Sequence, residues 1–200
     1  MNDKTIPVLL LVRGLPGSGK SYFSDKLYES FDTTSTLLLD PDATDYTSDA
    51  YKLHVQQQSA EGVDAKLFPY RFLRAQAYSA IEDHKVIIWN QPFTNLDILQ
   101  KVTTRLQDYA LEHGTKLPIL VIEVAIDPKI AKERVAMRKK SGGHGPSDEV
   151  FTRFVNEYSS AAPRGYDVIP IDGTLDPQTY TADIIAKVTS LRTEDGSITQ

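Results

Sequence analysis

The sequence contains no cysteine, and this absence excludes two kinds of site at the outset. Disulfide bonds and metal centres held by thiolates cannot form in a chain without sulfhydryl groups. His54, His84 and His113 lack the spacing of metal ligands, so a structural transition-metal site is not expected either. A chain without disulfides suits a reducing compartment, and we expect this protein to be cytoplasmic.

Long apolar runs and an excess of positive charge are also missing. The sequence has no run of about 18 apolar residues, the length needed to cross a bilayer. The polar segment from Met1 to Pro7 does not have the pattern of a secretory leader. The net charge of −5 argues against broad attachment to nucleic acid or to an anionic membrane. With 200 residues, of which 40% are apolar, the chain fits a single soluble domain.

Residues 14–21 carry the most specific pattern in the chain. They read Gly-Leu-Pro-Gly-Ser-Gly-Lys-Ser and match the phosphate-loop pattern G-x-x-x-x-G-K-[ST] at every position. The apolar run Val8 to Val12 predicts a buried strand before the motif, and Ser21 to Phe31 predicts a helix after it. This strand-loop-helix context is the one in which the motif binds a nucleotide.

Each residue type in this loop has a physical role. The glycines let the backbone turn tightly and aim N–H groups at phosphate oxygens, and the following helix contributes the positive end of its dipole. Lys20 is expected to span the β- and γ-phosphates, and the hydroxyl of Ser21 is expected to bind Mg²⁺. The sequence therefore predicts a site for ATP or GTP with Mg²⁺ as cofactor.

The rest of the chain alternates strand and helix patterns. After the first strand, further strands are predicted at Thr36 to Asp40, Lys85 to Asn90, Pro118 to Ile126 and Val168 to Ile171, with helical patterns between them. This order predicts an α/β protein with the P-loop NTPase fold, in which a five-stranded parallel sheet has helices on both faces and a helical lid. One domain is expected over 1–192, with a substrate-side insertion at about 41–84, a lid at about 128–160 and a flexible tail at 193–200.

Carboxylates that follow the second strand are candidates for catalysis. Asp40 is the first choice for a base that accepts a proton from an acceptor hydroxyl, and it is also a candidate metal ligand. Asp42 is its competitor: if Asp42 faces the substrate, Asp40 is left to hold a metal-bound water. Asn90 ends the third strand with an amide where many ATPases have a carboxylate, which makes a metal role for Asp40 or Asp42 more important.

Basic residues form a second group. Arg134 and Arg138 are four residues apart, so a helix would point both toward the same spot, as in a lid that closes over transferring phosphate. His144 lies in the glycine-rich loop that follows and is a candidate substrate contact. Arg71 and Arg74 could bind an anionic substrate from the insertion, although an exposed helix face explains them as well.

These residues together resemble the small P-loop kinases of the zeta-toxin and polynucleotide-kinase group, which are AAA-type ATP-binding proteins. The resemblance rests on the form G-x-P-G-S-G-K-S, on Asp40, and on Arg134 and Arg138 followed by a Gly-Gly-His-x-Pro element. The expected nucleotide-binding residues are Gly14, Pro16, Gly17, Ser18, Gly19, Lys20, Ser21, Arg134 and Gly173. The resemblance implies Asp40 as the base, Lys20 on phosphate, and Arg134 and Arg138 in the lid, and these four are the expected catalytic residues. From the residues themselves, Ser21 and Asp40 are the expected metal ligands. The expected substrate contacts are Asp40, Asp42, Arg71, Arg74 and His144.

The function expected from this resemblance is transfer of the γ-phosphoryl group of ATP to a hydroxyl of a small molecule. In the zeta-toxin type the acceptor is a UDP-N-acetylsugar. The resemblance also allows an inhibitory protein partner. A polynucleotide 5′-hydroxyl kinase is the alternative within the group, against which the acidic net charge counts. A different class of function is a nucleotide-binding switch that phosphorylates no acceptor.

Overall fold

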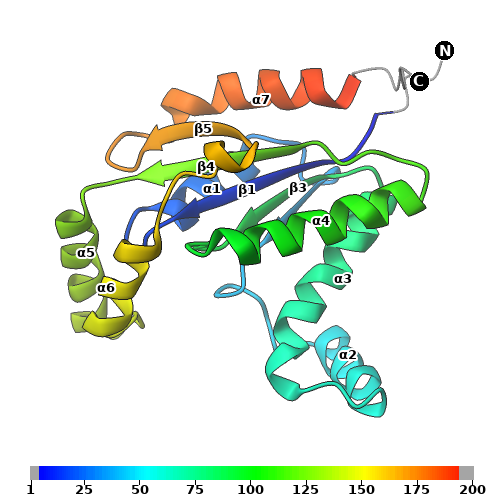
Figure 1. Ribbon diagram of the computed structural model, residues 1–200, viewed down its shortest axis with the longest axis horizontal. Coiled ribbons are helices and arrows are strands. Elements are labelled where there is room, and N and C mark those ends of the chain that lie inside the picture. Colours follow the sequence, from blue (N-terminus) through cyan, green and yellow to red (C-terminus); the bar gives the residue numbers. More distant parts are fainter. Residues whose placement is uncertain (1–4, 194–200) are drawn as a thin grey trace.

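The computed structural model describes residues 5–193, in which strands and helices alternate along the chain (Figure 1). The strands are β1 (Val8–Gly14), β2 (Thr36–Leu39), β3 (Val86–Asn90), β4 (Ile119–Ala125) and β5 (Asp167–Asp172). The α-helices are α1 (Lys20–Glu29), α2 (Asp49–Ala60), α3 (Phe68–Glu82), α4 (Leu96–Glu112), α5 (Pro128–Lys140), α6 (Asp148–Glu157) and α7 (Gln178–Thr193). Short 3₁₀ turns lie at Ala65–Leu67 and Ala162–Arg164.

The five strands form one parallel sheet in the order β2-β3-β1-β4-β5. The central strand β1 is buried along its whole length, as its run of Val and Leu residues predicts. Side chains of a strand alternate between the two faces of a sheet, so Leu9 and Leu11 face one side while Leu10 and Val12 face the other. The predicted fold class is confirmed.

Two apolar cores lie on opposite faces of the sheet. On one face Leu73 of α3 and Leu106 of α4 pack with Leu9 and Leu11. On the other face Phe23 of α1 and Ile184 of α7 pack with Val12 and its neighbours. Because both faces are covered, ligands can approach the sheet only at its ends, beyond the last residues of the strands.

Two helical parts extend from the sheet. Helices α5 and α6 occupy the region expected for a lid, and they pack on the phosphate loop through a small third core that includes Leu15, Val135 and Phe151 (Figure 1). Helices α2 and α3 fill the expected insertion, and α2 lies at the end of α3 that is remote from the sheet (Figure 1).

Two expectations concern membranes and the tail. Within residues 5–193 we find no helix long and apolar enough to cross a membrane. The expected tail over 193–200 begins with Thr193, which is the last residue of α7, and residues 194–200 lie outside the described part of the chain.

Candidate functional site

The phosphate loop connects β1 to α1 and is held in a conformation that requires glycine. Gly17 and Gly19 have φ values of 85° and 96°, a region that other residues rarely adopt. Gly19 is the N-cap residue of α1, and no side chain caps the free N–H groups of that helix end. The loop therefore presents backbone donors and the positive end of a helix dipole to a ligand, as the sequence motif predicts.

Gly173, in the segment after β5, lies against the phosphate loop. Its N–H donates to the carbonyl of Ala125 at 2.8 Å, which ties the end of β5 to the end of β4. A Cβ atom at position 173 would come within 2.2 Å of the Ser18 carbonyl oxygen. The loop and the segment after β5 thus approach each other so closely that only glycine fits at this position.

Arg134 connects α5 to both of these segments. From α5 its Nη1 donates to the carbonyl oxygen of Gly173 at 3.2 Å and to that of Gly17 at 3.5 Å. Arg138, one helical turn later, is exposed and lines a hollow together with Lys20, Ser21 and Gly17. The two arginines therefore lie on the same side of the phosphate loop, as their spacing predicts.

Lys20 is partly buried at the start of α1. Burial lowers its pKa, while the carboxylates of Asp42 and Asp40 act in the opposite direction and Arg138 lowers the pKa further. A polyanion bound at the loop would favour the charged form of Lys20. Burial removes part of the hydration that stabilises the charged ammonium group of Lys20, and a bound phosphate would stabilise that charge instead.

Asp40 belongs to a network at the ends of β2 and β3. Its Oδ2 accepts a hydrogen bond from Nδ2 of Asn90 at 2.6 Å, and the same amide group donates to Oγ of Ser21 at 3.0 Å. Its Oδ1 accepts from the backbone N–H of Asp42 at 2.8 Å. Both oxygens of Asp40 are therefore engaged, and Asn90 connects this carboxylate to the hydroxyl expected to bind the metal.

The donor set around Ser21 fits Mg²⁺. Magnesium prefers oxygen ligands, and in nucleotide sites it uses one or two protein oxygens while phosphates and water supply the rest. Ser21 and Asp40 offer such oxygens side by side, and the amide oxygen of Asn90 is buried without a hydrogen-bond partner among the described residues. Residues 5–193 hold no cluster of three or more His, Asp or Glu side chains placed to bind a metal by themselves.

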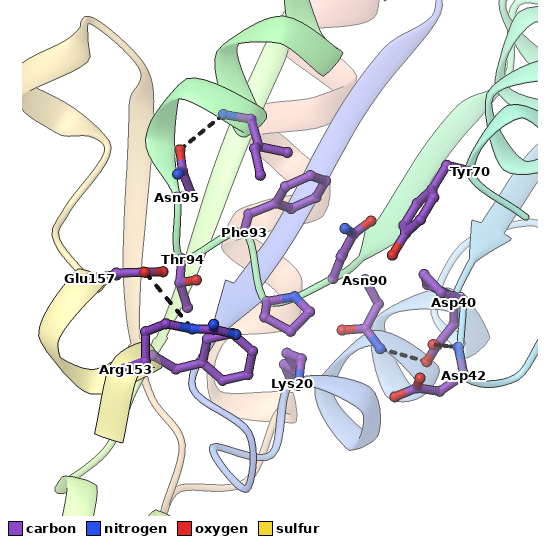
Figure 2. A pocket seen from close by; sticks show the side chains of 15 residues that line it. Lys20, Asp40, Asp42, Tyr70, Asn90, Phe93, Thr94, Asn95, Arg153 and Glu157 are labelled. Atoms are coloured by element: carbon purple, nitrogen blue, oxygen red, sulfur yellow. Dashed lines mark hydrogen bonds and ion pairs between the residues drawn. The ribbon is translucent and has the colours of Figure 1, made fainter. Parts of the chain in front are cut away.

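A cavity of about 420 Å³ opens beside Lys20 (Figure 2). Asp40, Asp42 and Tyr70 lie on one side of it, Arg153 and Glu157 of α6 lie on the opposite side, and Lys20 lies between them (Figure 2). A further wall comes from the segment after β3 and the start of α4, and its residues are Gln91, Pro92, Phe93, Thr94, Asn95 and Ile98. Pro41, Asn90 and Phe154 complete the lining.

A second cavity of about 280 Å³ lies on the other side of the loop. Gly19 and Arg134 line the part nearest the phosphate loop, the segment Asp172 to Thr174 adds polar groups, and apolar side chains line most of the rest. The apolar lining consists of Phe23, Val124, Ile171, Leu175 and Pro177, with Tyr22 beside them. This cavity can accept a flat, largely apolar group that is attached to a phosphate chain.

Several predicted substrate residues lie elsewhere. Arg71 donates from Nη1 to Oε1 of Gln58 at 2.7 Å and so joins α3 to α2. Burial lowers the pKa of Arg74, which lies on α3 in the field of Arg105 and Arg71. Neither side chain lines the cavity beside Lys20, and His144 is exposed in the loop between α5 and α6. A substrate role for these three residues stays a prediction.

The sequence did not predict several residues that line the cavity beside Lys20. Arg153, Glu157 and Tyr70 reach it from α6 and α3, although no motif marks them. The sequence does indicate one of these contacts. Arg153 and Glu157 are four residues apart on a predicted helix, and this spacing places them next to each other on its surface.

No sequence pattern predicted a role for Arg13, which is buried and fixes Phe93 in the wall of the cavity. Its Nε and Nη2 donate to the carbonyl oxygen of Phe93 at 3.2 and 2.9 Å. Phe93 has a φ of 42°, an unfavourable value for a bulky residue. The two hydrogen bonds therefore stabilise a strained turn that shapes the cavity.

Comparison with known proteins agrees with this geometry. A family model described as an AAA domain matches residues 9–160. No curated protein matches the chain in a sequence comparison.

Similar solved structures extend over almost the whole chain. A kinase candidate from Chloroflexus aurantiacus J-10-fl has a TM-score of 0.61 at 18% identity, with 93% of this chain and 98% of that chain covered. Kti12 from Chaetomium thermophilum, solved with ADP-AlF3, has a TM-score of 0.58 at 18% identity, with 92% and 98% covered. A gluconokinase from Sinorhizobium meliloti 1021 has a TM-score of 0.53 at 15% identity, with 94% and 95% covered. These likenesses establish the fold, and the match over residues 9–160 shows that the chain belongs to the AAA domain family.

Proposed function

We propose that this protein is a kinase that transfers the γ-phosphoryl group of ATP to a hydroxyl of a small molecule. The observation that carries the proposal is the position of the two cavities on opposite sides of the phosphate loop. A nucleotide whose phosphates lie on the loop would place its base in the apolar cavity beside Gly19. Its last phosphate would then point past Lys20 into the larger cavity, where an acceptor can bind.

Asp42 is the base in this proposal, and Asp40 supports the metal site. Among the described residues, none donates a hydrogen bond to the carboxylate of Asp42 or forms an ion pair with it, and this carboxylate borders the large cavity. Asp40 has both oxygens engaged with Asn90 and the Asp42 backbone. We therefore prefer Asp42 to Asp40 as the proton acceptor, which is the alternative that the sequence had left second.

In the proposed reaction the acceptor oxygen forms a bond to the γ-phosphorus while the bond from that phosphorus to the bridging oxygen of ADP breaks. The proton of the acceptor hydroxyl passes to the carboxylate of Asp42. Lys20, Arg138 and the backbone N–H groups of the loop stabilise the negative charge on the transferred group. Bound Mg²⁺, held through Ser21 and Asp40, would add charge neutralisation on the β- and γ-phosphates.

Solved structures with a similar fold support the proposed kinase function. A gluconokinase and a kinase candidate are among the proteins of similar structure, and both extend over nearly the same length as this chain. Kti12 was solved with ADP-AlF3, a nucleotide bound with a phosphate mimic. These proteins support a phosphotransferase, while membership of the zeta-toxin and polynucleotide-kinase group, with a UDP-sugar or a polynucleotide as acceptor, remains a finer prediction.

The test is transfer of labelled γ-phosphate from ATP with Mg²⁺ to a panel of sugars, nucleosides, UDP-sugars and 5′-hydroxyl oligonucleotides. We expect label on one class of acceptor, and loss of about 100-fold or more of this transfer in Lys20→Ala. Lys26→Ala is the matched control, because Lys26 lies on the same helix and its one ion pair among the described residues is with exposed Glu29. Label found only in free phosphate, at a rate that no acceptor changes, would favour a nucleotide-dependent switch instead.

A further inference from the structure

Carboxylates outnumber cations in the lining of the cavity beside Lys20. Three carboxylates line it, those of Asp40, Asp42 and Glu157. The cations that line it are Lys20 and Arg153. Because Lys20 would contact the nucleotide phosphates under the proposed function, Arg153 is left as the cation that could meet an acceptor.

Arg153 already has partners of its own. Its Nε lies 4.0 Å from Oε1 of Glu157, and its guanidinium carbon lies 5.8 Å from the ring centre of Phe154. Glu157 thus offsets part of the charge of Arg153, while Asp42, whose charge acts on Lys20, forms no ion pair among the described residues. A negatively charged group in this cavity would meet three carboxylates and, besides Lys20, a single cation whose charge Glu157 partly offsets.

Other cations that could bind an anionic acceptor point elsewhere. Arg138 lies in the hollow with Ser21 and Gly17, where the nucleotide phosphates are expected. Arg71 donates to Gln58, and Arg13 is buried against Glu123. Within residues 5–193, the lining of the large cavity includes no cation besides Lys20 and Arg153.

Uncharged groups complete the lining. Asn95 uses its Oδ1 to cap α4, and Gln91 accepts from the indole of Trp89 through its Oε1, so both amide nitrogens remain to donate. Tyr70 and Ile98 are 54% and 51% exposed and add apolar surface. Neutral amides beside exposed apolar surface suit the hydroxyls and the flat face of a sugar or a nucleoside.

We infer that the acceptor is a hydroxyl compound without phosphate or carboxylate groups. This inference rests on the proposed kinase function and narrows its substrate class. It separates free sugars, amino sugars and nucleosides, which the cavity favours, from UDP-sugars, nucleotides and the ends of polynucleotides, which carry phosphate charge into the cavity.

The experiment compares acceptors that differ by charge and share the reactive part. Suitable pairs are N-acetylglucosamine with UDP-N-acetylglucosamine and uridine with uridine 3′-monophosphate, which keeps the 5′-hydroxyl. Binding is measured by calorimetry on the full chain saturated with Mg²⁺ and a non-hydrolysable ATP analogue, and transfer is measured with labelled ATP. In the preferred pair we expect the uncharged member to bind and react about tenfold better than its phosphorylated partner.

Charge variants show whether the cavity carboxylates cause this preference. Asp42→Asn and Glu157→Gln should each strengthen binding of the phosphorylated member several-fold relative to the uncharged one. Glu149→Gln is the matched control, since it removes the same charge from α6 at an exposed position that does not line the cavity. Binding is the readout for Asp42→Asn because Asp42 is also the proposed base.

The outcomes separate this inference from the kinase proposal. Transfer to a phosphorylated acceptor at a rate equal to or above that of its uncharged partner would overturn the inference and leave the kinase proposal standing. Equal ratios in Glu157→Gln and Glu149→Gln would also overturn the role given to the cavity charges. Absence of both binding and transfer for every member would overturn the kinase proposal, and the inference with it.

Discussion

Nη1 of Arg13 lies 2.6 Å from Oε1 of Glu123, and these two residues are register partners on the adjacent strands β1 and β4. The pair does more than neutralise charge. Glu123 accepts a further hydrogen bond from the N–H of Ala161 at 2.7 Å, and Arg13 donates to the carbonyl of Ser159 at 2.8 Å. The buried pair therefore holds the chain after α6 against the sheet, at the same place where Arg13 holds Phe93.

Removing the charge of Glu123 should destabilise the protein strongly. Glu123→Gln leaves the guanidinium of Arg13 buried without a counter-charge, and we expect the free energy of unfolding to fall by about 3 kcal/mol. Urea unfolding measures this loss. The control is Glu29→Gln, which removes an exposed partner of Lys26 and should cost less than about 1 kcal/mol. Equal and small losses in both variants would show that the buried pair adds little.

Asparagine at positions 40 and 42 should have different effects on the reaction. Asp42→Asn removes the proposed base, so transfer should slow by about 100-fold or more while nucleotide affinity stays near that of the natural chain. Asp40→Asn disturbs the network with Asn90 and Ser21, so affinity for Mg²⁺ with ATP should fall by about tenfold or more. Single-turnover rates and calorimetric affinities measure the two effects. A reversed pattern would return the role of base to Asp40.

A methyl group at position 173 should disturb nucleotide binding. Gly173→Ala forces its Cβ toward the carbonyl of Ser18, so the phosphate loop must move, and we expect ATP affinity to drop by about tenfold or more. Titration with a fluorescent ATP analogue measures the change. Gly165→Ala is the control, because its Cβ meets no atom within 4 Å and its φ of 85° makes it a test of backbone strain alone. That control should lose about 1 kcal/mol of stability and keep its nucleotide affinity.

Acid should weaken the attachment of α2 through His54. The ring of His54 lies 5.4 Å from that of Phe72 between centres, and burial lowers the pKa of His54 below its ordinary value of 6.5. The unfolded chain therefore takes up this proton at higher pH than the folded chain does. Stability from this group is complete above about pH 6.5 and decreases as the pH falls toward the folded-state pKa.

The measurement is the free energy of unfolding at pH 7.5 and at pH 5.5. His54→Gln should lose less stability across this interval than the natural chain does, because glutamine takes up no proton. His144→Gln, which changes an exposed histidine, should lose as much as the natural chain. If both variants follow the same pH dependence, His54 is not the group responsible.

The sequence by itself predicted the phosphate loop and the order of the strands and helices. The loop works through backbone N–H groups and glycine torsion angles, so eight consecutive residues are enough to recognise it. The alternation of strands and helices likewise follows from local apolar patterns, and it limits the arrangement to a parallel sheet with its ligands at the carboxyl ends of the strands. Asp40 and Asn90 were predicted there for this reason.

Only the tertiary structure decided what lies opposite the nucleotide. Tyr70, Ile98 and Glu157 belong to three different helices, and no local pattern requires them to line the same cavity. The connection of Arg13 to Phe93 and to Ser159 spans 80 and 146 positions in the sequence. The roles of Asp40 and Asp42 depend on which hydrogen bonds each carboxylate makes, and their neighbours come from other strands and loops. A cavity formed by side chains from distant segments is a property of packing, so its charge could be judged only once the chain was folded.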